Sequence, residues 1–156
     1  MFIENLLGQL IRLRKPILSD FDNAKSNHIL ALDTNQEAAD PRSKVQLYEE
    51  TRDDQNCIVW SVDNLGSNNF LGFVSVNKSG DKFTLNISVD NSNSNGKEIV
   101  TESVNRVLNY LSFKKKIKEV YAYCGLENYV LKNVLINSGF LFVSKDEEKS
   151  LFQVSL

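Results

Sequence analysis

The chain has 156 residues and a mass of 17.7 kDa, the size of one ordinary domain. Hydrophobic residues make up 42% of the chain and charged residues 24%, which is typical of a globular protein and argues against disorder. Its 18 basic and 20 acidic side chains give a net charge of −2, without the basic excess of a general nucleic-acid binder. We therefore expect a single domain over residues 1–156 and no nucleic-acid partner.

The cysteines and the single histidine, His28, do not support a metal site. Cys57 and Cys124 each lie in an apolar run and form no Cys-x-x-Cys pair. Reduced, buried thiols of this kind are typical of a cytoplasmic protein. The N-terminal residues include an early Glu4 and no basic segment, and no apolar run reaches the ~20 residues of a membrane span. The expectation is a cytoplasmic protein without a metal, a secretory signal or a membrane segment.

The first third of the chain predicts a strand and two helices. Leu10–Arg14 alternates apolar and basic residues, which indicates a strand with one buried face, and Pro16 ends it. Ser19 is a candidate N-cap for a helix that carries apolar residues at helical spacing. A second helix is expected to begin at Asp40-Pro41, because proline is favoured at the first helical position.

The middle of the chain predicts three strands joined by short turns. The strands are expected at Cys57–Val62, Phe70–Val76 and Phe83–Val89. Polar turns are expected at Asp63–Asn69 and at Lys78–Asp81. Short turns between strand-forming runs predict an antiparallel meander.

The last third predicts a helix, a strand, a short helix and a hairpin. Apolar residues between Ile99 and Leu111 recur every three to four residues, which predicts a helix with one buried face. The next strand, Val120–Cys124, is expected to run parallel to Phe83–Val89, because a helix separates them. Asn128 is expected to cap a short helix that ends at Gly139 in a left-handed conformation. The residues expected to face inward from that helix are Val130, Leu131, Val134 and Leu135. The closing hairpin is expected to pair Leu141–Val143 with Leu151–Val154.

This order of elements resembles that of the GNAT acetyltransferase superfamily, and three local patterns resemble its RimJ/RimL-like branch. Ile11-Arg12-Leu13-Arg14-Lys15-Pro16 with Ser19-Asp20 resembles the opening of that branch. Asn95-Gly96-Lys97-Glu98-Ile99-Val100-Thr101-Glu102 resembles its phosphate loop and helix start. Asn128 followed by Gly139-Phe140 resembles its Asn…Gly-Phe helix. The resemblance implies an α/β (α+β) fold with a mixed, mostly antiparallel twisted sheet, a central parallel strand pair and flanking helices.

The resemblance also implies an acetyl-CoA-dependent N-acetyltransferase that acts on a protein N-terminus or a small amine. Acetyl-CoA would be the cosubstrate, with its pantetheine amides paired to a splayed strand and its pyrophosphate at a helix N-terminus. The cofactor-binding residues implied are Ile87, Ser88, Val89, Asn95, Gly96, Lys97, Glu98, Ile99, Val100 and Asn128. Asp90 is the candidate catalytic base. The acceptor site would involve the first two helices and the strand that carries Trp60. The resemblance is also compatible with a homodimer.

The chain departs from the family pattern at several positions. Glu98 stands where the family has glycine, so its carboxylate either points to solvent at small cost or occupies the anion site and repels the pyrophosphate. Leu135 replaces a general-acid tyrosine, and Leu131 replaces a small residue. The alternative function is therefore a catalytically impaired GNAT-fold protein used for binding or regulation.

Five other polar side chains are interpreted without a catalytic role. Tyr121, Tyr123 and Tyr129 are interpreted as core residues rather than acids, and Glu102 is expected to pack or to cap the helix start. His28 is interpreted as a helix-face residue without a catalytic role.

Overall fold

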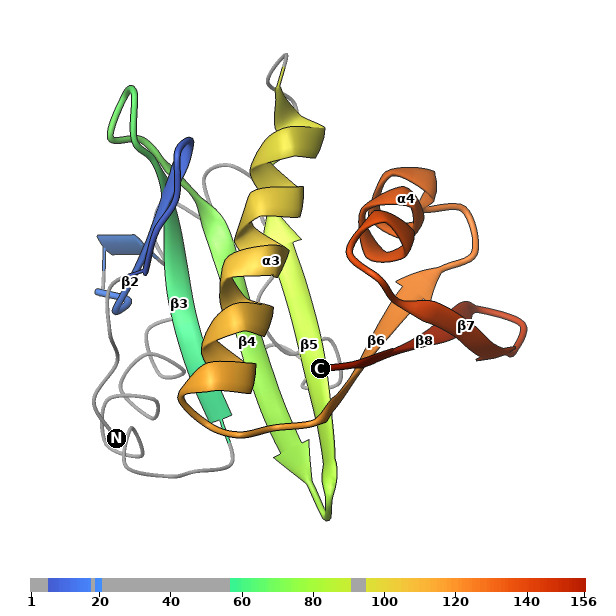
Figure 1. Ribbon diagram of the computed structural model, residues 1–156. Helices are drawn as coiled ribbons and strands as arrows, with labels where there is room; N and C mark the ends of the chain where they lie inside the picture. The colour runs from blue at the N-terminus through green and yellow to red at the C-terminus, as the bar shows by residue number, and fades with distance from the viewer. Residues whose placement is uncertain (1–5, 18, 21–56, 91–94) are drawn as a thin grey trace.

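The computed structural model describes residues 6–17, 19–20, 57–90 and 95–156. Eight strands of this part of the chain form one sheet in the order β1-β2-β3-β4-β5-β6-β8-β7. The strands are β1 (Leu6–Leu7), β2 (Ile11–Arg14), β3 (Cys57–Asn64), β4 (Phe70–Ser79), β5 (Lys82–Val89), β6 (Glu119–Gly125), β7 (Leu141–Lys145) and β8 (Lys149–Ser155). Helix α3 (Gly96–Phe113) lies across the face of β3, β4 and β5, and α4 (Tyr129–Asn137) lies beside the group of β6, β8 and β7 (Figure 1). The two helices predicted before Cys57, with His28 and Tyr48, lie outside the described residues.

Strand pairing follows the predicted topology. Every neighbouring pair in the sheet is antiparallel except β5 and β6, which are parallel. The meander β3–β4–β5 and the parallel crossover through α3 are therefore confirmed. The closing hairpin is confirmed as well, with β8 next to β6 and β7 at the edge of the sheet.

The predicted helical stripe forms the centre of the core. Ile99, Val104, Val107 and Leu111 are fully buried on the face of α3 that packs on the sheet. Trp60 on β3 is also fully buried, and its ring meets that of Tyr110 edge-on with 5.4 Å between centroids. Edge-to-face contact is the favoured geometry of aromatic pairs, so Trp60 anchors the helix on the sheet.

A buried ion-pair network joins β2 to β3 and explains the spacing of the opening motif. Arg14 donates to both oxygens of Asp20, at 2.8 and 2.9 Å, and to both oxygens of Asp63, at 2.6 and 3.0 Å. Asp20 also accepts from the Ser61 hydroxyl at 2.7 Å and from the Ile17 backbone N–H at 2.8 Å. The hydrogen bond to Asp20 is the main cause that raises the pKa of Arg14 above its usual value, against the opposing effect of burial.

The predicted polar turn at Asp63–Asn69 begins two residues too early, because Asp63 and Asn64 still belong to β3 and Asp63 is buried. It is 2% exposed, and Arg12 donates to its Oδ2 atom at 2.9 Å in addition to the bonds from Arg14. Two guanidinium groups compensate the loss of hydration of this carboxylate.

One further predicted boundary and the predicted burial of one side chain are also corrected. The strand β4 continues through Lys78 and Ser79, so the turn to β5 contains only Gly80 and Asp81. Gly80 has a φ of +61°, which glycine adopts without strain. Val130 on α4 was expected to face inward but is 42% exposed, whereas Val134 and Leu135 are fully buried.

A short hairpin of β1 and β2 is attached to α3 through Glu102. The carboxylate of Glu102 accepts hydrogen bonds from the backbone N–H groups of Gln9 and Leu10, with 3.1 Å from Leu10 N to Oε2. A Cβ atom at Gly8 would overlap this carboxylate, so a larger residue there would displace the Glu102 side chain. Of the two alternatives expected for Glu102, packing or capping of the helix start, the structure shows packing: its carboxylate lies against the β1–β2 turn and binds the backbone there.

Candidate functional site

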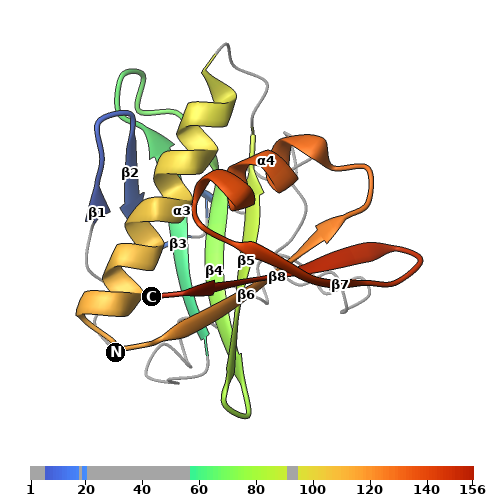
Figure 2. The same cartoon turned by 45° about the vertical axis from the view of Figure 1, so that its right-hand side comes forward.

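Strands β5 and β6 are paired over a very short length. Only Thr84–Tyr121 and Leu85–Ala122 are in register, and the residues that follow on each strand have no counterpart on the other. Each strand instead keeps a full ladder with its other neighbour, β5 with β4 and β6 with β8. Figure 2 shows β6 turning away from β5 towards α4. The end of β5 therefore has one edge that β6 does not cover.

The end of β5 beyond its pairing with β6 contains the first group of predicted binding residues. Ile87, Ser88 and Val89 pair on one side with Val74, Phe73 and Gly72 of β4. On the other side they extend beyond the last register pair with β6. A strand edge that extends past its neighbour is a place where an extended ligand can pair with the backbone.

Gly72 on β4 allows this end of β5 to approach closely. Its φ is +146°, and a Cβ atom there would lie 2.8 Å from Val89 Cα and would overlap the carbonyl oxygen of Ser88. A register shift between Val62 and Asp63 leaves Leu71 as an extra residue beside it. The sequence analysis did not identify Gly72, although a glycine inside a strand pattern is a sign of a bulge or of close backbone contact.

The start of α3 contains the second group of predicted binding residues. Asn95 is the N-cap but makes no side-chain capping bond, and the amide of Ile99 donates to Asn95 O at 3.0 Å. The amides of Gly96, Lys97 and Glu98 precede that bond, so the helix itself supplies no acceptor for them. Unpaired amides and the helix dipole together favour an anion at this position.

The side chains at the start of α3 point in two directions. Ile99 and Val100 are buried against the sheet. Lys97 and Glu98 are exposed and line a groove of about 650 Å³ between α3 and the β1–β2 turn. Other residues that line this groove are Gln9, Leu10, Thr101 and Glu102. Glu98 therefore takes the solvent-facing alternative, on the side of α3 that faces the hairpin.

Asn128 lies across the gap, after β6. Its side chain caps α4 as predicted, accepting from the Leu131 amide at 3.1 Å. The thiol of Cys124 donates to Asn128 O at 3.3 Å, and burial raises the pKa of this thiol. Cys124 is thus a protonated residue that supports the turn between β6 and α4.

Asp90 follows β5 directly and is half-buried. Its backbone N–H donates to Leu71 O at 2.7 Å, which fixes the chain where it leaves the sheet. On α4, Leu135 is fully buried. Because its side chain is an alkyl group, this position provides no acid.

The three tyrosines near the gap are not core residues, contrary to the interpretation from sequence. Tyr123 is 41% exposed, Tyr129 is 65% exposed and Tyr121 is half-buried. The ammonium group of Lys82 lies 4.5 Å from the ring centroid of Tyr121, and that of Lys149 lies 4.3 Å from that of Tyr123. Cation–π contacts therefore take the place of apolar packing around the rings of Tyr121 and Tyr123.

Comparison with protein families decides the identity of the fold. The family model described as "Acetyltransferase (GNAT) domain" matches residues 11–141. The chain belongs to the GNAT acetyltransferase family. A search of curated proteins finds no match to this GNAT protein.

Solved structures share the GNAT fold over almost the whole chain at low sequence identity. A RimL ribosomal L7/L12 α-N-protein acetyltransferase in complex with coenzyme A has a TM-score of 0.79 and 14% identity, with 98% of each chain covered. A ribosomal-protein-S5-alanine acetyltransferase from Vibrio fischeri has a TM-score of 0.78 and 15% identity, with 98% of this chain and 97% of the other covered. A spermidine N-acetyltransferase from Vibrio cholerae has a TM-score of 0.75 and 14% identity, with 95% of each covered.

Two further observations concern the described residues alone. None of the helices within them is both long and apolar enough to cross a membrane. In the same part of the chain, His, Cys, Asp and Glu side chains form no group of three or more that is placed to hold a metal ion.

Proposed function

We propose that this GNAT protein is an acetyl-CoA-dependent N-acetyltransferase that acts on a protein N-terminus or a small amine. The observation that carries the proposal is the early separation of β5 from β6 beside the uncapped start of α3. The unit proposed to carry the activity is a single domain of residues 1–156, working in the cytoplasm.

The residues present fit acetyl-CoA. The N–H groups at the start of α3 would bind its pyrophosphate, and the edge of β5 beyond its pairing with β6, from Ile87 to Val89, would pair with its pantetheine amides. Asn128 would border the pantetheine from the other side of the gap. Gly96 is buried at the first position of α3, next to these N–H groups.

The chemistry follows from the groups at the end of β5. When bound, acetyl-CoA supplies the acetyl group as a thioester. A backbone N–H near Val89 would donate to the thioester carbonyl oxygen and stabilise the negative charge that develops there. The Asp90 carboxylate would accept the proton of the attacking amine, directly or through water. Because α4 provides Leu135 rather than an acid, we assign protonation of the departing thiolate to water.

Lys97→Glu is expected to weaken acetyl-CoA binding at least fivefold at low salt. It puts a negative charge in place of a positive one in the first turn of α3, where an anion would bind, while an acidic residue at that place does not destabilise the helix. Isothermal titration calorimetry at about 20 and 300 mM salt measures the effect, which should shrink as salt screens the charge.

Lys118→Glu is the matched control, because it makes the same charge change on an exposed side chain after the other end of α3. Its dissociation constant for acetyl-CoA should stay within about twofold of that of the parent protein. Equal weakening by both variants would show that net charge, and not the start of α3, controls binding. No binding to the parent protein at millimolar acetyl-CoA would contradict the proposed function.

The second candidate function is a GNAT-fold binding or regulatory protein without catalysis. The buried Leu135 favours it, because the side chain at this position cannot donate a proton. On that reading Glu98 also blocks the pyrophosphate, so the parent protein binds acetyl-CoA poorly.

Glu98→Gly separates the two candidates. If the protein is an enzyme, we expect this variant to change acetyl-CoA affinity by no more than about threefold, since Glu98 points into the groove beside the β1–β2 turn. The substitution costs the helix about 1 kcal/mol, so Glu98→Gln serves as the control for stability. A gain in affinity of tenfold or more in both variants would favour the binding protein.

The acceptor class is tested directly by release of the coenzyme A thiol. Solved GNAT structures of similar fold include ribosomal-protein and spermidine acetyltransferases, so peptides with free N-termini and polyamines form the first panel. Acetylation of a peptide N-terminus or of a polyamine would support the enzyme. No turnover on any amine, together with weak acetyl-CoA binding that the Glu98→Gly variant improves, would support the second candidate.

A further inference from the structure

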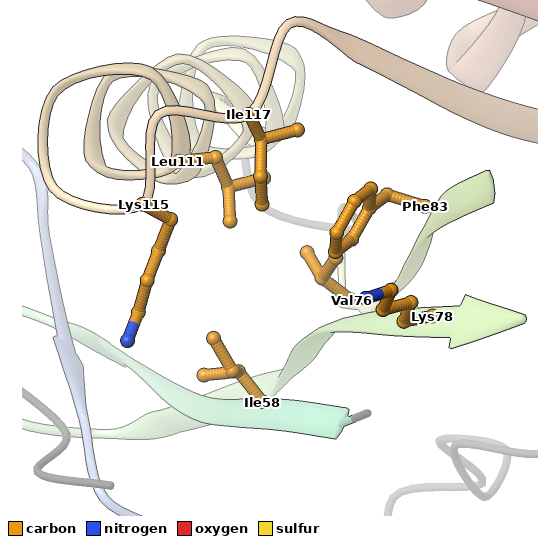
Figure 3. Close-up of a pocket in the computed structure, with 7 residues that line it drawn as sticks. All are labelled: Ile58, Val76, Lys78, Phe83, Leu111, Lys115 and Ile117. Atoms are coloured by element: carbon orange, nitrogen blue, oxygen red, sulfur yellow. The ribbon is translucent and has the colours of Figure 1, made fainter. Parts of the chain in front are cut away.

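A separate cavity of about 290 Å³ lies under the C-terminal end of α3. Its apolar walls come from four places in the chain (Figure 3): β3, β4, β5 and the end of α3 with the loop after it. The wall residues are Ile58, Val76, Phe83, Leu111 and Ile117. Ile58, Val76 and Leu111 are buried, so the walls belong to the core and are preformed.

Two lysines complete the lining, and no acidic side chain of the described residues contributes to it. The Lys115 ammonium points away from α3 towards Ile58, and the Lys78 side chain lies on the opposite side of the cavity, beside Phe83 (Figure 3). The Lys78 ammonium lies 5.6 Å from the Phe83 ring centroid. Among the described residues, neither ammonium forms an ion pair with a carboxylate. A protein of net charge −2 thus places two positive charges at an apolar cavity.

This cavity is distinct from the proposed acetyl-CoA site. Helix α3 has 18 residues, so its two ends are about 27 Å apart at 1.5 Å per residue. The cavity shares none of its lining residues with the end of β5 or the start of α3.

We propose that this cavity binds a small organic carboxylate with an apolar body, such as a medium-chain fatty acid. The hydrophobic walls would take the alkyl chain, and Lys78 and Lys115 would hold the carboxylate at the mouth. An apolar cavity of about 150 Å³ can hold benzene, so 290 Å³ suits a chain of about eight carbons. The site goes beyond acetyl transfer and does not depend on it.

The test uses octanoate with the full-length protein in the absence of acetyl-CoA. We expect saturable binding with a dissociation constant of about 1 mM or lower by calorimetry. Octanol, which lacks the charge, and acetate, which lacks the chain, should each bind at least tenfold more weakly. Methyl NMR signals of Ile58 and Ile117 should shift on binding, while the amide signals of Gly96 to Ile99 should not.

Substitutions then test the two ammonium groups. The double variant Lys78→Met with Lys115→Met should bind octanoate at least tenfold more weakly and lose the preference for octanoate over octanol. Lys118→Met, an exposed lysine outside the cavity, should bind octanoate as the parent protein does. Ile117→Trp fills the cavity and should abolish binding while circular dichroism shows an intact fold.

Four outcomes would overturn the proposal. They are no saturable octanoate binding, equal affinity for octanoate and octanol, unchanged binding in the double lysine variant, and signal shifts confined to the start of α3. The last would place octanoate in the proposed acetyl-CoA site. Failure of acetyl-CoA binding would leave this test unaffected, since none of its measurements uses that ligand.

Discussion

Replacing Arg14 with methionine is expected to lower the free energy of unfolding by about 3–5 kcal/mol. The guanidinium of Arg14 bridges Asp20 and Asp63, which are 1% and 2% exposed. Without it, Asp20 loses its only cation among the described residues and Asp63 keeps only Arg12. A buried carboxylate without its partner is costly because neither water nor a counter-ion replaces the lost interaction. Urea denaturation followed by the fluorescence of buried Trp60 measures the change.

Arg12→Met is the matched control for this experiment. The Arg12 side chain is 34% exposed, and among the described residues its guanidinium pairs with Asp63 alone, so we expect a loss of about 1 kcal/mol. Equal losses in the two variants would contradict the role assigned to Arg14.

The pH dependence of Arg14→Met has a definite sign. In the parent protein the pKa of Arg14 is raised, so its contribution is complete at every pH below the ordinary arginine pKa and is lost only in strong alkali. In the variant this contribution is absent at every pH. The difference in the free energy of unfolding between variant and parent should therefore stay constant between about pH 6 and 9 and shrink only in strong alkali, as urea denaturation at several pH values would show.

Gly72→Ala is expected to destabilise the protein by about 2–6 kcal/mol. The backbone at Gly72 has a φ of +146°, which a residue with a Cβ adopts at a cost of about 1–3 kcal/mol. The Cβ atom would also press on Ser88 and Val89 of β5, and overpacking of this kind costs about 1–3 kcal/mol more. Thermal and urea unfolding measure the sum of the two effects.

Gly80→Ala provides the comparison. Gly80 also has a positive φ, +61°, but nothing lies within 4 Å of a Cβ atom built there. Its replacement should cost about 1 kcal/mol, from the left-handed backbone alone. If Gly72→Ala were no more destabilising than Gly80→Ala, the close approach of β4 and β5 would not contribute to stability. If Gly72→Ala does fold, acetyl-CoA affinity should fall as well, because the substitution displaces the end of β5.

Periodicity predicted most of the described fold because the pattern is strong where one face of an element is buried. The stripe on α3 and the alternation in β2 were read correctly for this reason. The two-residue strand β1 is too short to show a period, and it forms because β2 and Glu102 hold it. Asp63 looked like a turn residue because the sequence does not show that Arg12 and Arg14 lie beside it.

The sequence indicated which segments form the candidate site, but not the directions in which their side chains point. Sequence indicated the end of β5 and the start of α3, and both lie at one end of the gap between β5 and β6. The direction of Glu98 depends on where the β1–β2 turn lies, which only the folded chain shows. The exposure of Tyr123 depends on Lys82 and Lys149, which approach it from other strands.

The short ladder between β5 and β6 has a consequence for sequence divergence. The groups that this gap presents are main-chain atoms of β5 and of the start of α3, which any residue except proline supplies in full. A recognition surface of this kind persists as long as the backbone path persists, whatever side chains the path carries. This dependence on the backbone alone agrees with the solved structures that are only 14–15% identical to this chain and share its fold over nearly their whole length.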